Sequence, residues 1–158
     1  MTRNAIVDTG PLVAFLDRGE RHHAWVAEQV RKLDAPLLVC EPVLAESFHL
    51  LSRHPAAQEA ILGLLEKGVL RIGFQLSEQL AEVASLCRKY RDVPMSLADA
   101  CVVRMAELHE RHAVFTLDSD FKVYRRYGSE PLPLIFPEKA QVRDCLRSRT
   151  PTPTLASR

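Results

Sequence analysis

The sequence predicts an α/β/α sandwich, in which helices cover both faces of a largely parallel central sheet of about four to five strands. Short apolar runs of strand length alternate along the chain with longer segments whose apolar residues recur at helical spacing. This alternation is typical of strand–helix–strand units, because parallel strands need a crossover between them. The chain has 158 residues, of which 47% are hydrophobic and 26% charged, as in one globular domain.

The first half of the chain contains three strand candidates, at residues 5–7, 36–40 and 69–74. Two helices are expected between the first two strands. Pro11 suits the first turn of one of them, and the other continues to about Asp34. Pro42 and Pro55 can each begin a helix of the next pair, because proline is tolerated in a first turn but not in a helix interior. Gly68 ends this pair before the third strand.

The second half of the chain predicts two more helices and two more strands. Ser77 is expected to begin one helix, since serine is a strong N-cap residue, and Pro94 separates it from a helix that Ser96 begins. Residues 118–127 are expected as a short helix or turn. Pro133 favours a place at the sheet edge for the last strand. The strand candidates lie at residues 113–117 and 132–136.

We expect one domain over residues 1–148 and a disordered tail over residues 149–158, where hydrophobic periodicity is absent. No apolar run approaches the roughly 18 residues of a membrane span, and the start of the chain does not resemble a signal peptide, so a cytoplasmic protein is expected. The cysteines form no C-x-x-C pair and have apolar neighbours, which favours buried free thiols. They are Cys40, Cys87, Cys101 and Cys145.

Four acidic residues fall at or near the points where apolar runs give way to helical segments. They are Asp8, Glu46, Asp99 and Asp118. An α/β fold gathers the carboxyl ends of its strands along one edge, so we expect these acids to share a cleft. Carboxylates at close range either keep a proton or bind divalent cations. The pattern therefore favours a metal-dependent hydrolase.

Each of these acids also has a structural explanation. Asp8 is well placed to cap the helix that follows it, although Thr9 could cap that helix and leave Asp8 free for a metal. Asp99 has the spacing of a capping box. Asp118 suits a turn, and Glu46 taken alone is an ordinary helix residue. It is the coincidence of all four at one predicted edge that favours a site.

The segments that carry these acids together resemble a PIN domain. They are IVDTGPLVAFLD at residues 6–17, EPVLAE at 41–46, SLADA at 96–100 and TLDSDF at 116–121. The resemblance covers about residues 4–136. It is strongest to the VapC-like ribonuclease toxins of bacterial toxin–antitoxin pairs, which are single small PIN domains.

The resemblance implies that the four acids hold one or two Mg²⁺ or Mn²⁺ ions and that the protein hydrolyses RNA. Thr116 matches the hydroxyl position of the family, Asp120 is an accessory acid, and Thr9 is an accessory polar residue. The resemblance also implies a homodimer and an antitoxin protein as an inhibitory partner. The apolar stripe of Ile61 and its neighbours would suit an interface, and ordinary core packing explains it equally well.

Basic residues concentrate toward the end of the chain, where residues 121–158 carry a net charge of +5 against +1 for the whole chain. Lys122, Arg125 and Arg126 are candidates to guide an RNA backbone past the acids, and a solvated basic face explains them equally well. The histidine pairs lack the partners of a zinc site. A non-catalytic PIN-like module that binds RNA or protein, with the acids as helix caps, remains the main alternative.

Overall fold

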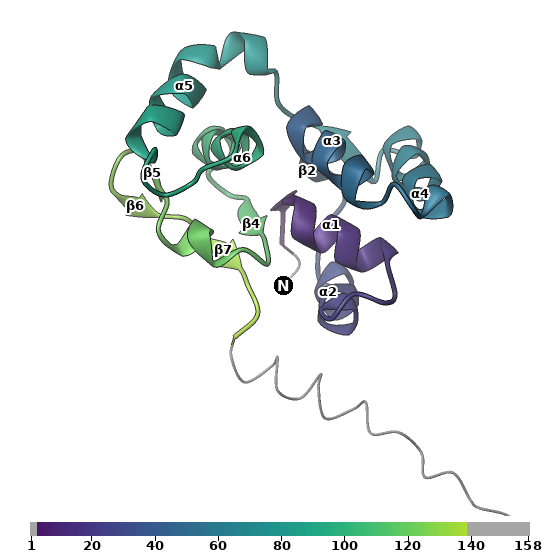
Figure 1. Ribbon diagram of the computed structural model, residues 1–158. Helices are drawn as coiled ribbons and strands as arrows, with labels where there is room; N and C mark the ends of the chain where they lie inside the picture. Colours follow the sequence, from purple (N-terminus) through teal and green to yellow (C-terminus); the bar gives the residue numbers. More distant parts are fainter. Residues whose placement is uncertain (1–2, 139–158) are drawn as a thin grey trace, which may run out of the picture.

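The computed structural model describes residues 3–138 and contains a five-stranded parallel sheet with the strand order β3-β2-β1-β4-β7 (Figure 1). The predicted α/β sandwich with a largely parallel sheet is therefore confirmed. The expected end of the domain near residue 148, the tail and Cys145 lie outside the described residues. The strands are β1 (Ala5–Val7), β2 (Leu37–Val39), β3 (Leu70–Ile72), β4 (Ala113–Phe115) and β7 (Leu134–Ile135).

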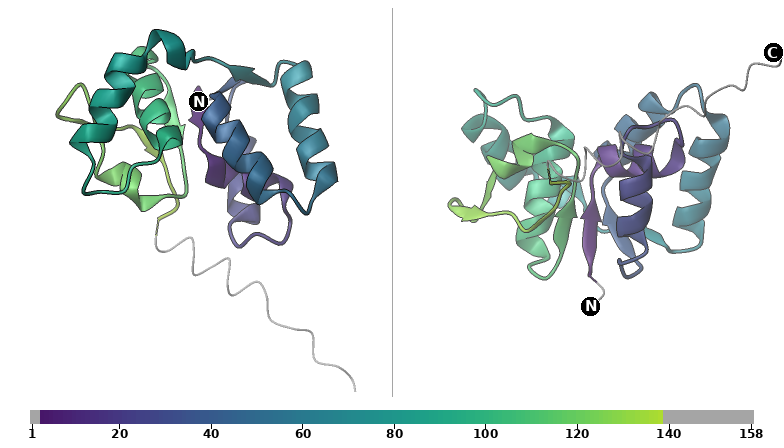
Figure 2. Two further views of the ribbon diagram at one scale, coloured as in Figure 1. Left: turned by 45° about the horizontal axis from the view of Figure 1, so that its top comes forward. Right: turned by 90° about the horizontal axis from the view of Figure 1, so that it is seen from below.

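Helices cover both faces of this sheet, as the two views of Figure 2 show. Proline stands in the first turn of α3 and of α4, as predicted. Within residues 3–138, no helix is both long enough and apolar enough to cross a membrane. The helices are α1 (Thr9–Leu16), α2 (His23–Val30), α3 (Glu41–Leu50), α4 (Pro55–Glu66), α5 (Leu80–Lys89) and α6 (Leu97–Leu108).

The central strand β1 shows why the core has two halves. Its three residues are buried, because a strand covered on both faces must be apolar on both. Ile6 packs into a cluster with Val102 of α6, whereas Ala5 and Val7 pack into a second cluster with Trp25 of α2. Successive side chains of a strand point to opposite faces, so this alternation places α6 and α2 on opposite sides of the sheet.

The edges of the sheet follow from the sequence. In β3 only Leu70 is buried, and Arg71 and Ile72 are exposed. Among residues 3–138, β7 pairs only with β4, in agreement with the edge position that Pro133 predicts.

Local structure differs from the prediction in two places. A 3-10 turn, η1 (Leu76–Glu78), precedes α5. Ser77 does not cap that helix because it lies within η1, and the N-cap position of α5 belongs to Gln79. Residues 118–127 form the 3-10 turn η2 (Ser119–Lys122) and then the strand β5 (Arg125–Arg126), which the prediction missed.

The missed strand β5 pairs with β6 (Glu130–Pro131) in a small antiparallel hairpin. Its turn contains Tyr127 and Gly128, with φ angles of 49° and 83°. A positive φ at Gly128 costs little, which makes so tight a turn accessible. The two strands are only two residues long and largely polar, so they show no alternating pattern that sequence analysis could detect.

Candidate functional site

The candidate site begins where the adjacent parallel strands β1 and β4 end. Val7 pairs with Phe115, so the next residues, Asp8 and Thr116, leave the sheet side by side. The Thr116 hydroxyl donates a hydrogen bond of 2.8 Å to Asp8 Oδ2. Next to this pair, Gly10 packs closely on Leu117, since a Cβ atom on Gly10 would lie 3.2 Å from Leu117 Cβ. Residues 108 positions apart in the sequence are thus joined by the register of one strand pair.

Asp8 is the most deeply buried acid of the four, with 5% of its surface exposed. It occupies the N-cap position of α1, yet its side chain makes no capping hydrogen bond. Burial raises the pKa of Asp8 to about 7, the hydrogen bonds from the Thr116 hydroxyl and the Thr9 backbone oppose this increase, and the carboxylates of Asp99 and Asp118 add to it. Helix capping therefore does not explain Asp8.

Asp99 combines a structural role with a place in the site. Ser96 and Asp99 form the predicted capping box of α6, with hydrogen bonds of 3.0 and 3.1 Å. The Tyr124 hydroxyl donates a further hydrogen bond of 3.3 Å to Asp99 Oδ2, the oxygen that the Ser96 backbone also reaches. Burial raises the pKa of Asp99, and the nearby Asp118 carboxylate raises it further.

Glu46 is exposed on α3, and a hydroxyl from α1 holds it. The Thr9 hydroxyl donates a hydrogen bond of 2.9 Å to Glu46 Oε2. The expectation that Thr9 could cap α1 is therefore wrong, because Thr9 is the first residue of that helix and its hydroxyl is turned toward α3. Thr9 instead links the helix that follows Asp8 to the helix that carries Glu46.

Asp118 has the turn-forming role that its sequence context suggests. Its Oδ1 accepts a hydrogen bond of 2.9 Å from the Asp120 backbone and so caps η2. Its own backbone N–H donates to the Thr116 hydroxyl at 3.0 Å. Thr116 therefore accepts from Asp118 and donates to Asp8, which ties the two acidic segments together through one buried hydroxyl.

Tyr124 is the site residue that sequence analysis missed. It is completely buried, and its ring packs edge to face against Tyr90 and Phe121. Burial raises the pKa of its hydroxyl, and the Asp99 carboxylate raises it further, so Tyr124 stays protonated and acts as a hydrogen-bond donor. The sequence contained one indication of this role: Tyr124 is an aromatic residue within a basic segment, and such a ring is expected to be buried among apolar side chains.

The three basic residues that are candidates to guide RNA make contacts away from the acids. Lys122 Nζ lies 4.1 Å above the Phe136 ring, and Arg125 donates to backbone carbonyls of residues 122–124. Arg126 approaches Glu130 at 3.4 Å. Among the described residues, no hydrogen bond or ion pair joins these three side chains to the four acids.

The chemistry of the donors fits a hard divalent cation. Carboxylate and hydroxyl oxygens are the ligands that Mg²⁺ and Mn²⁺ prefer. Between residues 3 and 138, none of the four acids forms an ion pair with Lys or Arg, although Asp8 is buried beside two other carboxylates. In that same part of the chain, no three or more His, Cys, Asp or Glu side chains already lie close enough together to enclose an ion.

The role of the Thr116 hydroxyl, which contacts two of the acidic segments, can be tested by substitution. We expect Thr116→Val, which keeps the shape but removes the hydroxyl, to lower the free energy of unfolding by about 1–3 kcal/mol, because Asp8 loses a donor and Asp118 an acceptor. The loss should be larger at pH 8 than at pH 5, since the bond to an ionised carboxylate is stronger and Asp8 ionises near pH 7. Urea unfolding at the two pH values measures it, and a loss independent of pH would contradict the assignment.

Comparison with known proteins identifies the family of this chain. The sequence pattern of the PIN domain family matches residues 5–127, a range that contains all four acids. The protein named "Ribonuclease VapC26" from Mycobacterium tuberculosis (strain ATCC 25618 / H37Rv) is 30% identical to this chain over 115 residues, which are 72% of this chain and 85% of that protein. The chain therefore belongs to the PIN-domain family and is a VapC-like member of it.

Proposed function

We propose that this protein is a ribonuclease that hydrolyses phosphodiester bonds of RNA with the help of one or two Mg²⁺ or Mn²⁺ ions, and that it acts as the toxin of a toxin–antitoxin pair. The likeness to a protein named as a VapC ribonuclease supports the activity. The observation that carries the metal requirement is Asp8, a buried acid whose pKa rises to about 7 beside two other carboxylates and whose side chain makes no capping hydrogen bond to α1.

The four acids have separate roles in this proposal. Asp8, Asp99, Asp118 and Glu46 would hold the ion, which when bound supplies an activated water and stabilises the charge that develops on the phosphate. Three hydroxyl groups orient the carboxylates, each through one hydrogen bond: Thr116 to Asp8, Tyr124 to Asp99 and Thr9 to Glu46. Fixing one oxygen of a ligand in this way orients the other, as is usual for groups around a metal.

The alternative hypothesis, a non-catalytic module that binds RNA or protein, explains only part of the site. It accounts for the capping box of Asp99 and for the turn at Asp118. It gives no reason for a carboxylate at Asp8, which is buried, makes no capping bond and has an unfavourable charge. Asp8 therefore favours the nuclease.

Cleavage of a pool of structured RNAs, including transfer RNAs, tests the proposed activity. We expect the full chain to cut RNA with Mn²⁺, to stop when a chelator is added, and to be inactive as Asp8→Asn. The exposed Asp92 offers a matched control, and Asp92→Asn should cut normally. Cleavage that survives in Asp8→Asn would come from a contaminant, and the binding module would then be preferred.

Tyr124 is expected to act as a positioning residue. Tyr124→Phe removes only the hydroxyl that donates to Asp99 and keeps the ring that packs in the core. A lost hydrogen bond of about 0.5–1.5 kcal/mol corresponds to roughly 2- to 13-fold weaker binding of Mn²⁺. Titration of Mn²⁺ measures this directly. An unchanged affinity, with the fold intact by circular dichroism, would mean that Tyr124 only fills space.

A further inference from the structure

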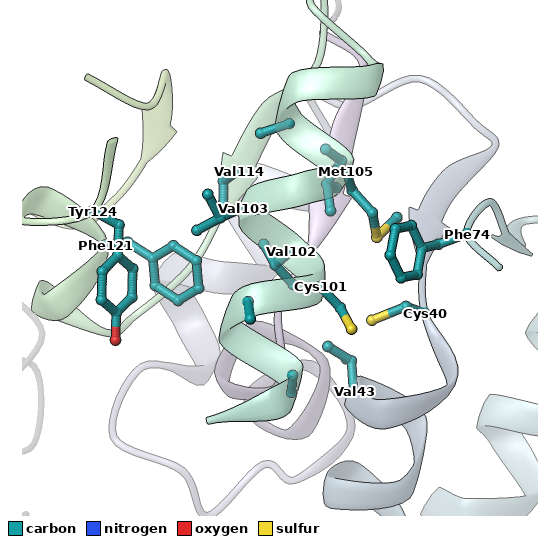
Figure 3. Packing of buried hydrophobic residues seen from close by; sticks show 14 of the residues in the cluster. Cys40, Val43, Phe74, Cys101, Val102, Val103, Met105, Val114, Phe121 and Tyr124 are labelled. Carbon is teal, nitrogen blue, oxygen red and sulfur yellow. The ribbon is translucent and has the colours of Figure 1, made fainter. Parts of the chain in front are cut away.

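Two cysteines face each other in the half of the core that contains α6. Cys40 is the residue before α3, and Cys101 lies in α6; neither side chain is exposed. Figure 3 shows their sulfur atoms pointing toward one another, among the side chains of Val43, Phe74 and Met105. Both are buried free thiols, as the sequence predicts. The fold brings them together although they are 61 positions apart in the sequence.

The side chains of the two cysteines face each other closely enough to affect the pKa of both thiols. The contact with Cys40 lowers the pKa of the Cys101 thiol against the effect of burial. The same contact, together with burial, raises the pKa of the Cys40 thiol. The thiolate is the reactive form of cysteine, and because the two sulfurs face each other, the second is in place to react once either one has been oxidised.

We propose that Cys40 and Cys101 are a modification site at which an oxidant of the peroxide class forms a reversible disulfide. The thiolate of one cysteine attacks one oxygen of hydrogen peroxide, the O–O bond breaks, and hydroxide leaves, which gives a sulfenic acid at that cysteine. The sulfur of the other cysteine then attacks the sulfenic sulfur, the S–O bond breaks, and water leaves with the proton of the second thiol. In total, two thiols are oxidised to one disulfide and one peroxide is reduced to two waters.

The fold gives this pair selectivity over the other described cysteine. Cys87 lies on α5, is half-buried, and takes no part in the contact between Cys40 and Cys101. A disulfide forms only where two cysteines are already close and correctly oriented, because its geometry is narrow. Complete burial keeps large reagents out, so we expect slow oxidation by peroxide during local opening of the core.

The bond would join the two helices that carry acids of the site. Cys40 directly precedes α3, which contains Glu46, and Cys101 is two residues after Asp99 in α6. These helices pack against each other. Drawing the two sulfurs together should displace the start of α3 relative to α6, and we infer that oxidation lowers RNA cleavage several-fold. This second step rests on the proposed ribonuclease function.

Peptide mapping of the oxidised full chain tests the disulfide without reference to activity. After treatment with hydrogen peroxide and alkylation of the remaining thiols, trypsin releases each cysteine in a different peptide. These peptides are residues 33–53 with Cys40, 72–88 with Cys87, 92–104 with Cys101 and 144–147 with Cys145. We expect peptides 33–53 and 92–104 to be joined in the monomer, and to separate after addition of dithiothreitol. Alkylated 33–53 and 92–104, or their linkage to the other two peptides, would overturn the proposal.

Two variants make this experiment specific. Cys87→Ser is the matched control and should still form the bond, whereas Cys101→Ala should not. If the alanine variant fails to fold, the mapping of the wild-type chain still decides. Cleavage of RNA by oxidised and reduced protein tests the second step: equal rates with the disulfide present would refute the regulation, and no cleavage by the reduced protein would refute the proposed function and leave the disulfide intact.

Discussion

Asp8→Asn should abolish RNA cleavage and at the same time stabilise the protein in the absence of divalent cations. Even groups that only contact metal ligands change affinity or activity by 10- to 100-fold when they are removed, so loss of a ligand should cost at least about 100-fold. The stability gain has a separate cause. In the folded state the pKa of Asp8 is about 7 against an ordinary 3.8, so its ionised form is disfavoured by up to about 4 kcal/mol above pH 7.

The sign of this effect depends on pH. A raised folded pKa means that Asp8 contributes most to stability below pH 3.8 and that this contribution is lost as the pH rises through about 7. Asparagine has no such charge and can still accept the hydrogen bond from Thr116. The gain in unfolding free energy should therefore be largest at pH 8, at about 1–4 kcal/mol, and smaller at pH 5.

Urea unfolding in the presence of a chelator measures this gain, with Asp92→Asn as the control that should change neither activity nor stability. A variant that is inactive and also less stable at pH 8 would indicate that Asp8 serves the fold. A variant that is both active and unchanged in stability would remove Asp8 from the site altogether.

Mn²⁺ should stabilise the wild-type protein, and more so at higher pH. A ligand at about 100 times its dissociation constant contributes about 2.7 kcal/mol, which corresponds to a rise in Tm of roughly 5–10 °C for a chain of this size. Because the cation needs the ionised form of Asp8, whose pKa is about 7, its apparent affinity should increase about tenfold between pH 6 and pH 8 and then level off.

Thermal unfolding with and without Mn²⁺ at several pH values measures this dependence. The shift should be absent in Asp8→Asn and present in Asp92→Asn. A shift that is the same at every pH, or one that Asp8→Asn retains, would show that the cation binds elsewhere on the protein.

The sequence predicted those parts of the fold that depend on local pattern. The apolar strand Ala5–Val7, the helices that begin with Pro42 and Pro55, and the capping box of Ser96 and Asp99 each follow from a few neighbouring residues. The hairpin β5–β6 could not be predicted in this way, because its pairing depends on a turn at Gly128 and on contacts with distant elements rather than on an apolar repeat.

The same distinction between local sequence pattern and tertiary contact applies to the candidate site. Asp8, Asp99 and Asp118 could be found because each stands at or near a strand end or in the first turn of a helix, whereas Glu46 lies within α3. The hydroxyl contacts could not, since Thr116 meets Asp8 only through the register of β1 and β4, and Tyr124 meets Asp99 only through tertiary packing. The same holds for Cys40 and Cys101, which the sequence describes correctly as buried but cannot identify as neighbours.

Mn²⁺ binding to the purified chain, followed by the electron paramagnetic resonance signal of the free ion, tests most directly whether the acids form a metal site. We expect one or two ions to bind to the wild-type protein and to Asp92→Asn, and Asp8→Asn and Asp99→Asn to bind at least about tenfold more weakly. Equal binding by all four proteins, or none by the wild type at millimolar Mn²⁺, would contradict a metal site built from Asp8 and Asp99.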